Sequence, residues 1–169
     1  RVAAGGKNLS SETIDAIALA ALKFNDLIHD LRSDYIFDPE SVTSFEGRTG
    51  PYILYTAVRL NSILRKADDA TSISTDSAVL SDDERNLLIA TLDFERTVQS
   101  AFDNRATDMI ANYAYDLCQL ANTFYHNCPI LRQDIDATTR AQRLQIARIA
   151  RNTLAQTIDL MGLIIPDEM

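Results

Sequence analysis

The stretch FEGRTGPYILYTAVRLNSILRK, residues 45–66, contains the start of a helix whose two sides differ in character. Thr49 can cap this helix, and Pro51 suits its first turn, where a missing N–H costs nothing. At about 100° per residue, Tyr52, Tyr55 and Arg59 fall within an arc of roughly 60°. The apolar residues occupy another arc, centred roughly 130° from Tyr52: Ile53, Leu54, Ala57, Leu60 and Leu64. The pattern predicts a helix from Pro51 to about Ala67 that packs with one side and presents two tyrosines and an arginine on the other.

This second side has two interpretations. Exposed aromatic rings beside an arginine can stack unpaired bases while the guanidinium holds phosphate. Alternatively, Tyr52 and Tyr55 cover the edge of the core and keep their hydroxyls in water, as tyrosines often do.

The composition indicates one domain with few turns. The chain has 169 residues, 46% of them apolar, with only 5 Gly and 4 Pro. No apolar run approaches the ~18 residues of a membrane span, and the first ten residues lack the apolar core of a signal peptide. Cys118 and Cys128 are expected to be reduced thiols of a cytoplasmic protein, because a metal site needs more ligands at closer spacing. The net charge of −8 argues against indiscriminate binding of polyanions but allows a local basic surface.

Helical periodicity covers most of the chain, so the predicted fold class is all-α, a bundle of about five helices. Residues 68–83 are rich in Ser, Thr and Asp and are predicted to form a surface loop. Residues 34–39 are expected to be extended. The predicted helices run from Ser10 or Ser11 to about Leu31, from Pro51 to about Ala67, from Ser81 to about Phe102, from about Thr107 to Asn127, and from about Thr139 to Met161. Ser81 with Glu84 forms a capping box, and Gly162 ends the last helix.

The last predicted helix has four arginines and no acid between residues 137 and 158: Arg140, Arg143, Arg148 and Arg151. On a helical wheel they span roughly 140°, with some apolar residues inside the arc. In an acidic protein, such a set can contact phosphates at a modest, salt-sensitive energy. The alternative is that these arginines pair with acids of neighbouring helices.

Catalytic patterns are absent from the sequence. His29 and His126 have no neighbouring residues that suggest a triad or a metal site, and the glycines match no phosphate-binding loop. The residues alone therefore indicate a protein that binds rather than catalyses. A helical module that binds an acidic protein partner, without RNA, is the alternative function.

Four segments, in order, resemble the C-terminal region of arginyl-tRNA synthetases. They are SDYIFD (33–38), SFEGRTGPYILYTAVRLNSILRKA (44–67), ANYAYDLCQLANTFYHNCPIL (111–131) and RLQIARIARNTLAQTIDLMGLIIPDEM (143–169). The resemblance implies a helical anticodon-binding domain of the DALR type at 46–169. Residues 1–45 would be a lead-in helix and connector from the catalytic-domain side. The nucleotide-binding signatures of class I synthetases have no counterpart here, so no cofactor is expected in this chain, although the parent enzyme uses ATP with Mg.

The same resemblance implies that Tyr52, Tyr55, Tyr113 and Met169 lie near the anticodon loop of tRNA(Arg). The protein is expected to be a monomer. The helical wheel instead places Tyr113 on an apolar side and Tyr115 roughly 200° away from it. Either of these two tyrosines can therefore be the one that faces RNA. The sequence also departs from the family pattern, with Gly50 where alanine is common and Glu168 where a basic residue is usual.

Overall fold

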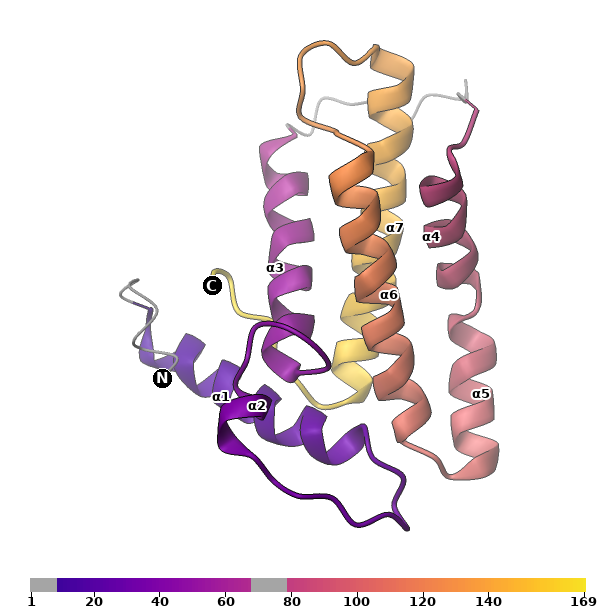
Figure 1. Cartoon of the computed structure of the whole chain (residues 1–169). Helices are drawn as coiled ribbons and strands as arrows, with labels where there is room; N and C mark the ends of the chain where they lie inside the picture. Colours follow the sequence, from indigo (N-terminus) through magenta and orange to yellow (C-terminus); the bar gives the residue numbers. More distant parts are fainter. Residues whose placement is uncertain (1–8, 68–78) are drawn as a thin grey trace.

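The structure, a computed structural model, describes residues 9–67 and 79–169 (Figure 1). All regular secondary structure in these ranges is helical. The helices are α1 (Ser11–Leu27), α2 (Pro39–Val42), α3 (Gly50–Lys66), α4 (Asp82–Leu92), α5 (Phe94–Asn104), α6 (Asp108–Asn127) and α7 (Ala137–Leu160). In the described part of the chain, no helix is both long enough and apolar enough to cross a lipid bilayer. The predicted all-α class is confirmed.

Helices α3, α6 and α7 run side by side, and α4 and α5 follow one another along α6 (Figure 1). Helix α1 crosses the end of this bundle and packs mainly on α3. One core is shared by α1, α3, α4, α6 and α7, and its largest fully buried side chains include Phe24, Leu54, Leu117, Phe124 and Leu154. Burial of apolar side chains of this size stabilises the fold by roughly 1.5–3 kcal/mol each.

The starts of α3 and α4 follow the predicted caps. The Thr49 hydroxyl accepts a hydrogen bond from the Tyr52 N–H at 3.2 Å, and Pro51 lies in the first turn. Both bonds of the capping box at Ser81 and Glu84 are present. At the other end of the chain, Gly162 adopts a φ of 65°, which glycine reaches without a steric penalty, and so ends α7.

Several predicted boundaries are wrong. Helix α1 ends at Leu27 rather than near Leu31, and the short α2 lies in the connector. Helix α7 begins at Ala137, two residues before the predicted start. The reason is that the Asp136 carboxylate accepts a hydrogen bond from the Thr139 N–H at 2.9 Å and caps the helix. Most of the loop predicted at 68–83 lies outside the described residues.

The single helix predicted from Ser81 to Phe102 is two helices, α4 and α5, separated at Asp93. A tertiary contact accompanies the break: the Tyr113 hydroxyl of α6 donates a hydrogen bond to the Ala90 carbonyl at 2.8 Å. That carbonyl also accepts from the Asp93 N–H, a bond of i to i+3 type. A side chain that inserts into the backbone ladder is a known cause of helix kinks.

Gly50 allows the close approach of α1 to α3. A Cβ atom built on this residue would lie 2.1 Å from the Ala20 carbonyl oxygen. Alanine at this position would therefore require α1 to move. Ile17 and Phe24 of α1 are fully buried in the shared core. The division of the chain at residue 45 stays a prediction.

Candidate nucleic-acid interface

One surface of α3 and α6 gathers aromatic rings and guanidinium groups. We call this surface the aromatic face. Its members from α3 and the residues just before it are Arg48, Tyr52, Tyr55 and Arg59, and those from α6 are Tyr115, Asn122 and Tyr125. Figure 1 shows the two helices that carry these residues lying side by side. The face therefore depends on tertiary packing and not on α3 alone.

Arg59 lies between two tyrosine rings. Its guanidinium carbon is 4.6 Å from the centroid of the Tyr55 ring and 5.0 Å from that of Tyr125. It donates hydrogen bonds to the Asn122 side-chain oxygen at 2.7 Å and to the Tyr55 hydroxyl at 3.0 Å. These partners are neutral, and no described carboxylate forms an ion pair with Arg59. The arrangement fixes the guanidinium and leaves its positive charge uncompensated.

A second guanidinium covers the other end of the face. Arg48 lies 5.0 Å from the centroid of the Tyr115 ring and donates to the Asn112 side-chain oxygen at 3.1 Å. The Tyr115 ring in turn is tilted against Tyr52, with 5.7 Å between centroids. Two arginines, Arg48 and Arg59, thus flank the Tyr52–Tyr115 pair that joins α3 to α6.

The two tyrosines of α3 differ in burial. Tyr55 is 38% exposed, which agrees with the helical wheel. Tyr52 packs against the core, and its hydroxyl accepts a hydrogen bond from the Asn122 amide at 2.9 Å. Burial raises the pKa of Tyr52. The expectation that both rings lie on a non-packing side of the helix is therefore wrong for Tyr52.

Tyr113 lies on another side of α6, away from the aromatic face. Its ring is 6.0 Å from that of Phe94, its hydroxyl contacts α4, and burial raises its pKa to about 12. The structure brings Tyr115, not Tyr113, together with Tyr52. Met169, the other residue implied by the resemblance, is half-buried and packs against the core.

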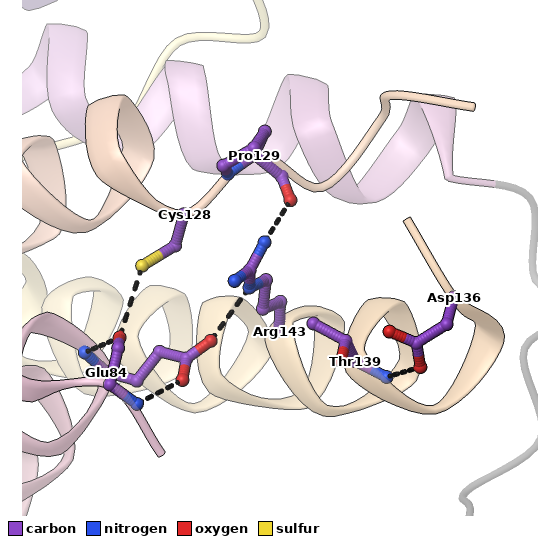
Figure 2. Close-up of polar contacts among 7 residues, drawn as sticks. Glu84, Cys128, Pro129, Asp136, Thr139 and Arg143 are labelled. Carbon is purple, nitrogen blue, oxygen red and sulfur yellow. Dashed lines mark hydrogen bonds and ion pairs between the residues drawn. The ribbon is translucent and has the colours of Figure 1, made fainter. Parts of the chain in front are cut away.

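Of the four arginines predicted on the last helix, Arg143 is an internal ion-pair partner. Figure 2 shows its side chain between Glu84 and the Pro129 carbonyl. Nε lies 2.8 Å from the Glu84 carboxylate, and a terminal nitrogen donates to Pro129 at 2.8 Å. Only 17% of the Arg143 side chain and 2% of the Glu84 side chain are exposed. Arg140 is half-buried, with a buried Nε that finds no hydrogen-bond partner in the described residues.

Arg148 and Arg151 lie elsewhere, at an open hollow of about 690 Å³ between α3, α7 and the C-terminal tail. Arg65 of α3, which sequence reasoning did not select, lines the same hollow. The four arginines therefore do not form one surface.

Sequence reasoning also missed Arg48, Asn122 and Tyr125 of the aromatic face. Tyr115, Asn122 and Tyr125 recur at helical spacing on α6, which is a weak signal for a shared side. Nothing in the sequence indicates that this side meets Tyr52 and Arg59 of α3. In the described part of the chain, no group of three His, Cys, Asp or Glu residues is placed to hold a metal ion.

Comparison with known proteins identifies the class of this helical bundle as anticodon-binding. The family model described as DALR anticodon binding domain matches residues 53–169. The chain belongs to this family.

Relatives and solved structures agree with that assignment. The chain is 41% identical to the arginine–tRNA ligase of Francisella tularensis subsp. novicida (strain U112), over 92% of the chain and 28% of that protein. It is 38% identical to the arginine–tRNA ligase of Maricaulis maris (strain MCS10), over 90% of the chain and 26% of that protein. The arginyl-tRNA synthetase structure from Thermus thermophilus matches 99% of the chain and 29% of its own length, with 30% identity and a TM-score of 0.90. The chain thus spans little more than a quarter of these proteins.

Proposed function

We propose that this chain is the tRNA-binding part of an arginine–tRNA ligase and that its aromatic face recognises the anticodon stem-loop of tRNA(Arg). The observation that carries the proposal is the arrangement around Arg59, whose guanidinium is fixed between Tyr55 and Tyr125 by neutral groups. Membership of the DALR anticodon-binding family supports the same function. Anticodon bases are unpaired and can be splayed out, so they are suited to stacking on such rings.

In this proposal the exposed rings hold bases and the arginines position the backbone. Tyr55 and Tyr125 are the most accessible rings of the face, and Tyr115 is half-buried beside them. Arg48 and Arg59 supply positive charge at the two ends of the face. Phosphate contacts fix register, while contacts to bases carry the specificity.

The resemblance also assigns Tyr113 and Met169 to RNA contact, and both assignments stay predictions. Tyr113 has its hydroxyl engaged on the Ala90 carbonyl, so we place Tyr115 ahead of it as the tyrosine of α6 that meets RNA. Met169 lies at the end of a tail that Arg65 ties to α3 through the Asp167 carbonyl at 3.2 Å. A tail held in this way can present its last residue to a bound loop.

The activity of the whole protein is likewise a proposal. Arginylation with ATP and Mg would be carried out by a catalytic domain in the remaining part of the protein, since the chain spans only 28% of its Francisella relative. We infer that this domain packs on the lead-in segment, which exposes several large apolar side chains. Ile36 of the connector is 96% exposed, and the others are Leu19, Leu22, Leu31 and Phe37. Exposed apolar groups in such number are typical of an interface.

We further propose a cytoplasmic, monomeric protein. Cys118 and Cys128 are both free and buried, which suits a reducing compartment. The monomeric state can be checked by light scattering on the purified chain and on the whole protein.

The test is a binding titration of the 169-residue chain with tRNA(Arg) and with the same tRNA carrying substituted anticodon bases. We expect the substituted tRNA to bind at least about fivefold more weakly, because loss of one good base contact is worth about 1–3 kcal/mol. A duplex of equal length serves as the control for nonspecific attraction. Equal binding of all three RNAs, or of none, would contradict the proposal and favour the alternative of a protein-interaction module.

A further inference from the structure

The hollow between α3, α7 and the C-terminal tail is lined by one apolar residue, Leu64, and by three arginines, two asparagines and one aspartate. The polar residues are Arg65, Arg148, Arg151, Asn61, Asn152 and Asp167. Figure 1 shows the tail passing beside α3, and the bond from Arg65 to the Asp167 carbonyl holds it there. The hollow is a separate feature from the aromatic face, although both use α3.

Two of the three guanidinium groups at this hollow, those of Arg65 and Arg151, are oriented by neutral partners. Nε of Arg151 donates to the Asn61 side-chain oxygen at 2.6 Å, and a terminal nitrogen donates to that of Asn152 at 3.1 Å. Arg65 donates to a backbone carbonyl. Arg148 is exposed, and no described residue forms a hydrogen bond or ion pair with it. The contrast is with Arg143, whose charge is matched by Glu84 at 2.8 Å.

Positive charge therefore exceeds negative charge at the hollow, in a protein whose net charge is −8. The Asp167 carboxylate offsets one of the three arginines. An anion that enters would meet several N–H donors from arginine and asparagine, which is the donor set that binds phosphate oxygens well. A carboxylate of a protein partner would accept hydrogen bonds from fewer of these donors, because it has only two oxygens. Successive phosphates of an RNA backbone present more oxygens over a longer distance.

We propose that this hollow is a binding site for the RNA phosphodiester backbone, outside the region where the bases are read. The inference rests on the proposed function, because it assumes that RNA is held at the aromatic face. Arg59 and Arg65 are six residues apart on α3, which is about 9 Å of helix rise and about a third of a turn around the axis. Backbone leaving the aromatic face can therefore reach the hollow. The site would add affinity and orientation without reading sequence.

The experiment measures binding of a fluorescent tRNA anticodon stem-loop to the 169-residue chain over a range of salt concentrations. The variants are Arg65→Gln and Arg148→Gln, both at exposed positions, so that the fold should be retained. Arg96→Gln, an exposed arginine of α5 paired with Asp93, is the matched control. We expect each hollow variant to lower the slope of log affinity against log salt by about 0.7–0.9, which is about a five- to eightfold loss of affinity at 0.1 M salt. The control should change neither the slope nor the affinity.

A second measurement locates the contact on the RNA. Backbone linkages of the stem-loop are replaced one at a time by neutral methylphosphonates. At one or two linkages, the replacement should weaken binding of the unchanged chain but not of Arg148→Gln, since the variant has already lost the contact. If no linkage behaves in this way and the salt slopes of the variants are unchanged, the inference is overturned.

The two proposals can fail separately. If Tyr55→Ala weakens binding while the hollow variants bind as the unchanged chain does, the aromatic face is supported and the hollow is excluded as a phosphate site. If the unchanged chain shows no preference for the tRNA(Arg) anticodon but the hollow variants still reduce the salt slope, the phosphate site is supported and the anticodon assignment fails.

Discussion

Arg59 and Arg143 are both arginines held by hydrogen bonds between two helices, yet their surroundings differ in charge. Arg143 is largely buried and lies 2.8 Å from a carboxylate that is 2% exposed. Arg59 has two tyrosine rings and an asparagine as partners. The first arrangement ties α7 to the start of α4 and to Pro129, two residues beyond the end of α6, and its charge is neutralised. The second keeps a positive charge available at the surface. Both arginines have hydrogen-bond partners. The charge of those partners therefore distinguishes a structural arginine from a binding arginine.

The largest expected effect is on stability, at the Arg143 site. Glu84→Gln retains a side chain that can complete the capping box but leaves the Arg143 charge buried without a counter-charge (Figure 2). Breaking a buried pair from one side costs roughly 3–5 kcal/mol. We expect a loss of about 3 kcal/mol, near the lower limit, because Arg143 keeps its bond to the Pro129 carbonyl. Chemical denaturation measures it.

Asp82→Asn is the matched control, since Asp82 is an exposed acid in the first turn of the same helix. We expect it to change stability by less than about 0.5 kcal/mol. If Glu84→Gln changed stability as little as Asp82→Asn, the buried ion pair would not distinguish Arg143 from Arg59.

The next effect is on binding, at the aromatic face. Tyr55→Ala should weaken affinity for the anticodon stem-loop by about 1–3 kcal/mol, because a stacking platform is lost. The free energy of unfolding should change by less than about 1 kcal/mol, since the ring is 38% exposed. Phe102→Ala removes an exposed aromatic ring from α5 and should leave binding unchanged. Equal loss of affinity in both variants would exclude a specific role for the face.

A smaller effect should distinguish Tyr52 from Tyr55. Tyr52→Phe removes the acceptor of the Asn122 amide at a half-buried position, and we expect a loss of about 1 kcal/mol in stability. Tyr55→Phe removes a hydroxyl bonded to Arg59 at an exposed position, where water can replace it. Its stability should change by a few tenths of a kcal/mol. Thermal unfolding of both variants in one buffer makes the comparison, and a reversed order would mean that Tyr52 is the more accessible ring.

The last effect is confined to alkaline pH and concerns Tyr113. Burial raises the pKa of Tyr113 from 10.0 to about 12. The folded protein therefore keeps this proton at a pH where the unfolded chain releases it, so the stabilising contribution is complete below pH 10 and is lost as the pH rises from about 10 to about 12. Tyr113→Phe should show a shallower decline of unfolding free energy across that window than the unchanged chain. Parallel slopes would indicate that the hydroxyl of Tyr113 is not buried against Ala90.

Local signals in the sequence predicted the main helices but not every interruption. The caps at Thr49 and Ser81 act over three residues, so they can be recognised without knowing the fold. The break at Asp93 could not be predicted in that way. The accompanying contact comes from Tyr113, which lies 23 positions beyond Ala90 along the chain.

For the candidate site, the sequence alone determined the all-α class, the start of α3, and Tyr55 and Arg59 as neighbours on the side of α3 away from its apolar residues. Only the tertiary structure decided what each arginine does. Arg59 meets Asn122 across 63 positions, Arg143 meets Glu84 across 59, and Arg151 meets Asn61 across 90. A helical wheel gives the direction of a side chain about the helix axis but does not show which residues of other helices face that side chain. The packing of the helices decides whether a guanidinium meets a carboxylate that neutralises its charge or only neutral groups.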